Sequence, residues 1–417
     1  MQVQLSGARP RADLLELPWD RPLLQWEDPR LVRMVRGPAR HVVRFVELGV
    51  HVLAVKETDD THARHEYQML RVIAEAELPA VQAVGIVTGR TTPDGEPLGG
   101  AVITRYLDFA LPYTYLLARE HGLEHQRRLI DAAAVLLVRL HLDGIWWGDC
   151  SLANMLFRRD AGALAAYLVD AETAEHRQPL PERLRTADTE IAMENVAGGV
   201  ADLVAAGRLP GTTDPTAFAV RLERRYCQLW DELTVEEEHA ANELWRLDER
   251  VERLNRLGFD VGELEIRAVD VAQRIRLRPS VVEEGHHSRK LKRLTGIDVQ
   301  ENQARRLLND LNAVRARQEH QVGRPLSEGE AAHRWLTQCF EPFVAAIPAD
   351  LRGRLEPAEA YHQYLDHRWY LSERAGTDVP ADRAVASFVD DVLRNRPDER
   401  VVLPTGEVEA VRRAAGS

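Results

Sequence analysis

The stretch of sequence that decides the fold covers residues 148–157 and reads Gly-Asp-Cys-Ser-Leu-Ala-Asn-Met-Leu-Phe, and Tyr-Leu-Val-Asp follows at residues 167–170. Its chemistry lies in Asp149, Asn154 and Asp170. Carboxylate and amide oxygens, together with waters and substrate phosphates, are the ligands with which proteins usually hold Mg²⁺. Phosphoryl transfer needs metal ligands and a separate carboxylate that positions and deprotonates the accepting hydroxyl. This segment supplies both kinds of group.

The segment also predicts a hairpin that brings two of these side chains together. Residues 154–158 and 165–169 are short strand-like runs on either side of a turn sequence. With Gly162 at the centre of the turn, an antiparallel pairing places Asn154 opposite Asp170. We therefore expect an amide oxygen and a carboxylate to meet at the open end of the hairpin, with Asp149 in the loop before it.

The order of elements around this segment is distinctive. Residues 1–28 contain three prolines and predict an irregular lead-in. Strands are then expected at residues 31–36, 41–47 and 50–57, a helix that starts after the capping-competent residues 59–61 and runs to about Glu77, and strands at residues 81–88 and 101–106. Beyond them the pattern is helical at residues 113–121 and 127–142. Later helices are predicted at residues 217–233, 235–257, 286–294, 299–320, 328–340 and 358–374, with a hairpin of residues 261–266 and 275–278.

The 148–157 segment resembles the catalytic loop of the protein-kinase-like superfamily, in which an Asp is followed five residues later by an Asn. Asp170 corresponds to the metal-binding Asp after the hairpin. With Gly148 before the Asp, the segment resembles that of small-molecule kinases, such as the aminoglycoside and choline kinases, more than that of eukaryotic protein kinases, which carry Arg at this place. The resemblance implies that Asp149 is the catalytic base and that Asn154 and Asp170 hold Mg²⁺. Glu172, two residues further on, is a candidate for a further metal ligand.

The upstream half adds an independent resemblance. Lys56 ends the alternating run Leu-Ala-Val-Lys, which resembles the third strand of kinases. Glu66 lies on the same face of the next helix as the apolar residues Met69, Leu70 and Ile73. A strand lysine that faces a helix glutamate is the ion pair that holds ATP phosphates in kinases. The Ala-Val-Lys strand and the Arg-His-Glu-Tyr helix resemble the lipopolysaccharide-kinase-like group. With its C-terminal extension, the chain resembles a bacterial family of unassigned function that carries a kinase-like domain and a domain of unknown function (DUF4032).

These resemblances imply an α+β fold of the two-lobed protein-kinase-like type. We expect an N-lobe with an antiparallel sheet over residues 1–107, a helical C-lobe over residues 108–213 and a mainly helical extension over residues 214–417. ATP and Mg²⁺ are the expected cofactors. The backbone around Thr104 and Tyr106 should line the adenine site.

The sequence departs from the protein-kinase pattern in several places. There is no glycine-rich loop between the first two strands, where Arg36, Gly37 and Arg40 stand instead, and the two arginines could cover phosphates by charge. Trp147 precedes the loop, Ala-Glu follows Asp170, and no Ala-Pro-Glu segment marks an activation segment. These features favour a small-molecule or glycan acceptor over a protein.

Composition narrows the class of protein. The 417 residues are 45% hydrophobic and 29% charged, and the net charge of −12 argues against a nucleic-acid or anionic-membrane binder. Three widely spaced cysteines exclude a disulfide framework and suit a reducing compartment. The first thirty residues have no signal-peptide core, and no run approaches the roughly 18 apolar residues of a membrane span. We therefore expect a cytoplasmic protein.

Two further features have a functional and a structural interpretation. Cys150 adjoins Asp149 but has no histidine fixed beside it, so an inert packed thiol is favoured over a nucleophile. The basic stretch of residues 286–293, followed by Arg305 and Arg306, could bind phosphates or RNA. A solvated helix face, or pairing with the acidic helices of residues 233–243, is favoured.

Three functions remain open from the sequence. The first is an ATP- and Mg²⁺-dependent phosphotransferase that acts on a hydroxyl of an unidentified acceptor. The second is a nucleotide-binding regulatory or pseudokinase module whose helical extension engages a protein partner. The third is transfer of a nucleotide instead of a phosphate.

Overall fold

The computed structural model describes the backbone of residues 1–6, 12–32, 41–49, 51–119, 122–234, 237–240, 263–268, 274–280 and 285–400. These residues divide into two compact units. Unit 1 contains residues 1–158 and 166–226, and unit 2 contains residues 159–165 and 227–400. The division into three segments expected from the sequence stays a prediction.

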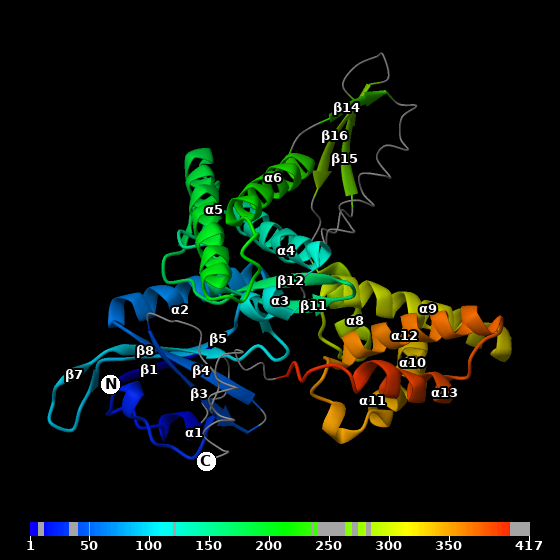
Figure 1. Cartoon of the computed structure of the whole chain (residues 1–417), viewed down its shortest axis with the longest axis horizontal. Coiled ribbons are helices and arrows are strands. Elements are labelled where there is room, and N and C mark those ends of the chain that lie inside the picture. Colours follow the sequence, from blue (N-terminus) through cyan, green and yellow to red (C-terminus); the bar gives the residue numbers. More distant parts are fainter. Residues whose placement is uncertain are drawn as a thin grey trace. The chain divides into compact units, whose positions relative to one another are not determined.

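A six-stranded antiparallel sheet forms the N-terminal half of unit 1 (Figure 1). Its order is β1-β5-β8-β4-β3-β2. Buried Leu53 and Val55 alternate along the fourth strand, as a strand with one face on a core requires. The strands are β1 (Gln2–Leu5), β2 (Leu31–Val32), β3 (Val42–Leu48), β4 (His51–Thr58), β5 (Ala83–Thr88) and β8 (Gly100–Arg105).

The N-terminal segment is more ordered than its prolines predict. Strand β1 pairs with β5, and a short helix, α1 (Ala12–Leu15), and a 3₁₀ turn, η1 (Leu23–Gln25), follow it. Leu14, Trp19 and Leu23 are buried in one hydrophobic cluster with sheet residues. The expectation of an irregular lead-in is therefore wrong for these residues, because their apolar side chains cover one face of the sheet.

Helix α2 (Asp60–Glu75) follows β4 and packs against β5 and β8 (Figure 1). It begins where Asp59 accepts hydrogen bonds from the backbone N–H groups of Thr61 and His62, which satisfies two donors of the first turn. Leu70 and Ile73 lie on its buried face, and so does Glu66, which is 1% exposed. The helix therefore holds a carboxylate against the sheet.

The rest of unit 1 is mainly helical, so the predicted α+β class is confirmed. The 20-residue helix α4 (Leu123–Leu142) is buried over most of its length because its alanines and leucines occupy successive turns. The other elements, of which β11, β12 and α6 include residues assigned to unit 2, are β6 (Arg90–Thr91), β7 (Pro97–Leu98), β9 (Leu111–Pro112), α3 (Tyr113–Arg119), β10 (Ile145–Trp146), η2 (Leu152–Asn154), β11 (Met155–Asp160), β12 (Ala163–Leu168), β13 (Glu175–His176), α5 (Glu182–Ala205) and α6 (Pro215–Thr234).

The turn between β11 and β12 has a different register from the one the sequence predicts. Ala161 and Gly162 both have positive φ angles, +50° and +88°, as in the two-residue turn that connects hairpin strands. The N–H of Val169 donates to the carbonyl of Asn154 at 3.0 Å. Asn154 therefore pairs with Val169, one residue short of Asp170. The predicted register fails because the turn is centred between two residues, not on Gly162.

Unit 2 has a core of its own. Trp335, Phe343, Tyr361 and Phe388 lie at its centre, in contact with one another through ring packing. Its helical elements are α8 (His286–Thr295), α9 (Glu301–Val322), α10 (Glu328–Trp335), η3 (Leu336–Phe340), α11 (Glu341–Ala346), η4 (Ala349–Leu351), α12 (Pro357–Ala375), α13 (Ala381–Ser387) and η5 (Phe388–Leu393).

A three-stranded sheet, β14 (Glu237–Ala240), β16 (Arg274–Ser280) and β15 (Glu263–Ala268), also belongs to unit 2. The predicted hairpin of residues 261–266 and 275–278 is confirmed where it is described, since β15 and β16 pair antiparallel. The predicted helix over residues 235–257 is wrong at β14, which pairs with β16, and its remainder lies outside the described residues. Among the described helices, none is both long and apolar enough to cross a membrane.

Candidate functional site

The loop that carries Asp149 is anchored by a buried aspartate on helix α5. Asp188 has no exposed surface and accepts hydrogen bonds from the backbone N–H groups of Trp147 at 2.7 Å and Gly148 at 2.9 Å. Each of its two oxygens thus accepts one backbone N–H that would otherwise be buried without a partner. The backbone just before Asp149 is consequently fixed to α5.

His141, at the end of α4, extends this anchor. Its Nε2 lies 3.1 Å from Asp188 Oδ2, and its Nδ1 lies 2.6 Å from the hydroxyl of Tyr226 on α6. Burial lowers the pKa of His141 and outweighs the neighbouring carboxylate, so the neutral imidazole is favoured. A neutral ring that donates to Asp188 and accepts from Tyr226 satisfies all three groups.

The Asp149 carboxylate is held on both sides by amide groups. Asn154 donates from Nδ2 to Asp149 Oδ2 at 3.1 Å and to the Asp149 carbonyl at 3.0 Å. Asn195, on α5, donates from Nδ2 to Asp149 Oδ1 at 3.3 Å and to the Cys150 carbonyl at 3.0 Å. Because the Asn154 amide nitrogen faces Asp149, its oxygen is left for another ligand.

Trp147 connects this loop to the segment that carries Asp170. The indole is fully buried, and its Nε1 donates to the carbonyl of Asp170 at 2.9 Å. The hydroxyl of Thr173 donates to the carbonyl of Trp147 at 2.7 Å. The tryptophan that departs from the kinase pattern therefore has a structural role, since it connects the loop before Asp149 to the segment of Asp170.

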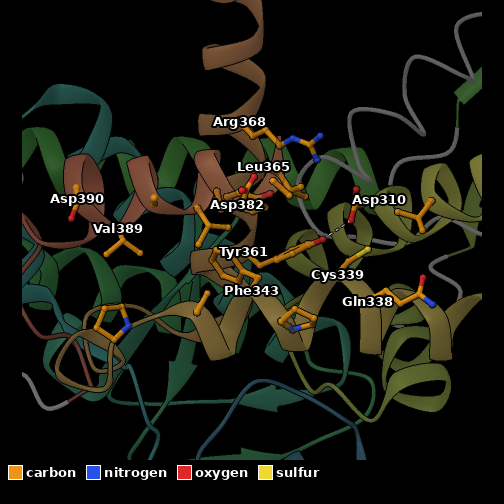
Figure 2. Close-up of a pocket in the computed structure, with 18 of the residues that line it drawn as sticks. Asp310, Gln338, Cys339, Phe343, Tyr361, Leu365, Arg368, Asp382, Val389 and Asp390 are labelled. Carbon is orange, nitrogen blue, oxygen red and sulfur yellow. Dashed lines mark hydrogen bonds between the residues drawn. The ribbon is translucent and has the colours of Figure 1, made fainter. Parts of the chain in front are cut away.

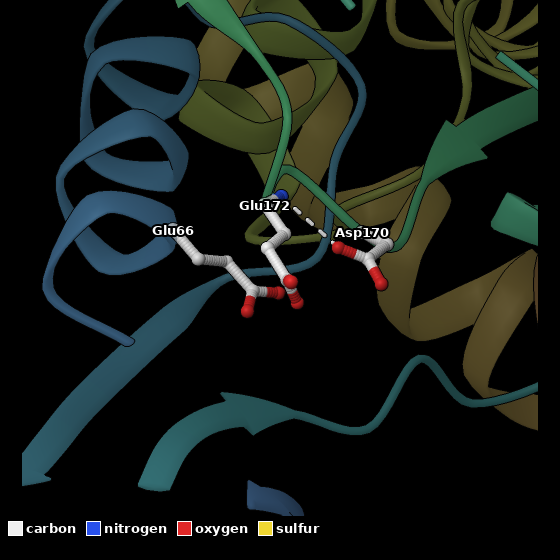
Figure 3. Close-up of side chains that lie close together, drawn as sticks. All are labelled: Glu66, Asp170 and Glu172. Atoms are coloured by element: carbon white, nitrogen blue, oxygen red, sulfur yellow. Dashed lines mark hydrogen bonds between the residues drawn. The ribbon is translucent and has the colours of Figure 1, made fainter. Parts of the chain in front are cut away.

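Three carboxylates, those of Glu66, Asp170 and Glu172, lie close together (Figure 3), and each has an oxygen near the Lys56 ammonium. The Lys56 ammonium lies 2.7 Å from Asp170 Oδ2, 2.9 Å from Glu172 Oε2 and 3.2 Å from Glu66 Oε2. The backbone N–H of Glu172 donates to Asp170 Oδ1 at 3.0 Å, which orients the second carboxylate oxygen toward the lysine. The pairing of Lys56 with Glu66 expected from the sequence is present in this geometry.

The ionisation of Lys56 and of Glu66 depends on burial and on the charges beside them. Burial opposes the protonated form of Lys56, but Glu66 and Asp170 outweigh it, and the lysine pKa is raised. Burial, reinforced by the charge of Asp170, raises the pKa of Glu66 to about 7 despite the attraction of Lys56. The lysine is therefore charged at neutral pH, whereas Glu66 is ionised there only in part.

Oxygen atoms suitable for a divalent cation are present. One oxygen from each of Glu66, Asp170 and Glu172 lies within 4.8 Å of the other two. Glu66 Oε2 and Glu172 Oε2 are buried and accept no hydrogen bond of suitable geometry from the described residues. Hard oxygen ligands of this kind fit Mg²⁺. Asn154 makes no hydrogen bond to Asp170 in the described part of the chain, so a joint role in metal binding stays a prediction.

The remaining predicted residues are located as follows. Thr104 lies in β8, between β4 and β5, and Tyr106 follows that strand with its backbone N–H bonded to the carbonyl of Val52 at 2.9 Å. Burial raises the pKa of Tyr106 to about 12. Arg36, Gly37 and Arg40 lie outside the described residues. The role of each residue in nucleotide binding stays a prediction.

Cys150 and the basic stretch of residues 286–293 have structural surroundings, and pairing of the basic stretch with residues 233–243 stays a prediction. Cys150 is fully buried, and burial raises the pKa of its thiol, which is unfavourable for a nucleophile. In the basic stretch, Lys290 pairs with Glu328 at 3.1 Å and Lys292 with Asp298 at 2.7 Å. These lysines are therefore engaged by acidic groups of unit 2.

Unit 2 contains a cavity of about 630 Å³ (Figure 2). Phe343, Tyr361 and Tyr364 contribute aromatic surface to its wall, and the Tyr361 hydroxyl donates to Asp310 Oδ2 at 2.8 Å. Arg368 lines the cavity but is paired with Asp378. The residues with the predicted chemistry belong to unit 1, whereas the residues that line this cavity belong to unit 2.

Comparison with known proteins supports two resemblances. The lipopolysaccharide kinase (Kdo/WaaP) family matches residues 50–194, which include Lys56 and Asp149, and the domain of unknown function DUF4032 matches residues 228–393. The family resemblances predicted from the sequence are thus confirmed. No curated protein matches the chain.

Two solved structures are similar to part of the chain. One is WaaP in complex with acyl carrier protein, which is 18% identical with a TM-score of 0.36, over 62% of this chain and 99% of that one. The other is an aminoglycoside-3'-phosphotransferase of type VIII, which is 13% identical with a TM-score of 0.30, over 48% of this chain and 86% of that one.

Proposed function

We propose that the protein is an atypical kinase-like phosphotransferase that uses ATP and Mg²⁺ to phosphorylate a hydroxyl of an acceptor, with a small molecule or glycan favoured over a protein. The observation that carries the proposal is the contact of Lys56 with Asp170 at 2.7 Å, next to a loop in which Asp149 is held by two amides. The match of residues 50–194 to a lipopolysaccharide kinase family supports it.

Each residue has a role in this proposal. Asp149 orients the acceptor hydroxyl and takes its proton, since its two oxygens are already fixed by neutral donors. Asn154, Asp170 and Glu172 offer oxygens to the metal, which would neutralise charge on the phosphates. Lys56, kept charged by its carboxylate neighbours, turns from them to the phosphates of ATP.

The adenine would lie against the stretch that follows β8. The N–H of Arg105 donates a hydrogen bond to the carbonyl of Gln82, and the N–H of Tyr106 donates one to the carbonyl of Val52. The N–H of Leu107 makes no hydrogen bond within the described residues, so it is the donor that we assign to the base. Arg36, Gly37 and Arg40 would cover the phosphates from the preceding connection.

The test is turnover of ATP labelled at the γ or the α phosphate, with Mg²⁺ present and water or the protein itself as acceptor. We expect release or transfer of the γ label and its loss, by about 10² to 10⁴-fold, in Asp149→Asn. Equal turnover in Asp149→Asn would remove the assignment of the base. Transfer of the α label would instead establish nucleotidyl transfer.

The second candidate is a nucleotide-binding regulatory module whose helical extension engages a protein partner. It is supported by unit 2, which has its own core and a cavity of about 630 Å³. The two candidates differ in one measurement. Thermal stabilisation by ATP without any turnover favours the regulatory module, and no stabilisation with or without metal contradicts both.

A further inference from the structure

Three carboxylates from two parts of unit 1 point toward one another. Glu66 comes from helix α2, and Asp170 and Glu172 come from the segment after β12 (Figure 3). The Glu66 side chain is 2% exposed, and that of Glu172 is 21% exposed. Three acidic groups this close repel one another unless a cation lies among them.

The cation in this structure is the ammonium of Lys56. It is within 3.2 Å of an oxygen of each carboxylate, but it makes a well-directed hydrogen bond with Asp170 at 2.7 Å. Glu66 Oε2 and Glu172 Oε2 are buried and accept no hydrogen bond of suitable geometry among the described residues. An ammonium has three protons in fixed directions, whereas a divalent cation binds oxygens without that restriction.

The charges do not balance with Lys56 alone. Three carboxylates surround one ammonium, and His41 adds a positive charge near Glu172 Oε2, at 3.1 Å, only when its ring is protonated. An uncompensated negative charge that is largely buried is costly. Glu66 is ionised only in part at neutral pH, because burial raises its pKa to about 7, and a cation of charge two would offset the three acidic groups better than the lysine does.

We propose that Glu66, Asp170 and Glu172 form a divalent-cation site which Lys56 occupies in the nucleotide-free protein, so that the lysine and the metal ion compete for it. Glu66 is then a metal ligand and not solely the partner of Lys56. The inference rests on the proposed function in that Asp170 and Glu172 are taken as metal ligands. When Lys56 turns to a phosphate, the three carboxylates become free for the ion.

The experiment is titration of the full chain with Mn²⁺, followed by electron paramagnetic resonance of the free ion, without nucleotide. Lys56→Met removes the ammonium and keeps a side chain of similar length. We expect Lys56→Met to bind Mn²⁺ at least about 10-fold more tightly than the wild type, because it no longer competes. Adding Glu66→Gln to Lys56→Met should weaken binding by about 10-fold or more. Glu75→Gln in the same background is the matched control, since Glu75 is exposed on the same helix.

Two outcomes overturn the proposal. Mn²⁺ binding in Lys56→Met that is no tighter than in the wild type contradicts competition, and binding that is unaffected by Glu66→Gln removes Glu66 from the ligands. If Lys56→Met is poorly folded without metal, Mn²⁺ must raise its melting temperature more than that of the wild type. Equal shifts also overturn the proposal. Because no step uses ATP, failure of phosphate transfer would defeat the proposed function and leave this result unchanged.

Discussion

Asn195 donates a hydrogen bond from Nδ2 to Asp149 Oδ1 at 3.3 Å, across a separation of 46 residues. The same nitrogen lies 3.0 Å from the Cys150 carbonyl, so one amide holds both the side chain and the backbone of the loop. Asp188, on the same helix, holds the two preceding N–H groups. Helix α5 therefore determines where the Asp149 carboxylate lies.

Removing this amide should impair the chemical step more than substrate binding. In Asn195→Ala we expect kcat to fall on the order of 10 to 100-fold, because Asp149 loses one of the two groups that orient it. The KM for ATP should stay within about twofold, because Asn195 contacts Asp149 and Cys150 and no residue that we assign to the nucleotide. Steady-state kinetics measure both.

Glu194→Ala is the matched control for Asn195, because Glu194 is the exposed preceding residue of the same helix. It should leave kcat and KM at wild-type values. Asn195→Ala would lose its assigned role if it kept the wild-type kcat, or if its kcat fell only in proportion to the fraction of folded protein.

Trp147→Phe should destabilise the protein. The substitution keeps an aromatic ring but removes the N–H that donates to the Asp170 carbonyl at 2.9 Å, in a position with no exposed surface. A buried acceptor without its partner costs about 1–3 kcal/mol in free energy of unfolding. Urea denaturation measures the change. Trp369→Phe, at a side chain that is 66% exposed, is the control and should have almost no effect. An equal effect of the two substitutions would contradict the role of Trp147.

Asp188→Asn should weaken the loop anchor. The aspartate accepts three donors with its two oxygens, whereas asparagine offers one acceptor and presents an N–H₂ group to a remaining donor. We expect a loss of about 1–3 kcal/mol in free energy of unfolding and a fall in turnover of about 10-fold or more, since the loop before Asp149 loses a fixed position. Asp202→Asn, exposed on the same helix, is the control. Wild-type turnover in a folded Asp188→Asn would refute the anchor.

The parts of the site that the sequence predicts are those with a local, periodic signal. Lys56 lies on an alternating strand, and Glu66 shares a helix face with buried Leu70. Each pattern fixes the direction of a side chain relative to the core, so their meeting could be expected. The α+β class follows from the same signals.

Other parts depend on contacts that no local pattern reports. Asp188 and Asn195 are ordinary polar residues of a helix until tertiary packing places them beside the loop. The hairpin register depends on the positive φ of Ala161. Alanine rarely adopts this conformation, so the sequence does not predict it. The order of the N-terminal segment likewise depends on Trp19 and Leu23 being covered by the sheet.

In unit 2, the acid sensitivity of helix α8 should depend on Glu301. Its Oε1 accepts from the N–H of His287 at 3.1 Å and lies 2.6 Å from that ring, and its Oε2 accepts from the N–H of Ser288 at 3.1 Å. Burial opposes ionisation, but these bonds outweigh it and hold the pKa of Glu301 below its ordinary value of 4.5.

A carboxyl with a depressed pKa contributes stability above the pKa of the unfolded chain, and the contribution is lost as the pH falls through the folded value. Glu301→Gln should therefore lower the free energy of unfolding by about 1 kcal/mol at pH 7, and the difference from the wild type should shrink as the pH falls below the ordinary value of about 4.5 toward the lower pKa of the folded protein. Urea denaturation between these limits measures it, with exposed Glu341→Gln as the control. A difference that is independent of pH would show that lost packing, and not the charge of Glu301, accounts for the effect.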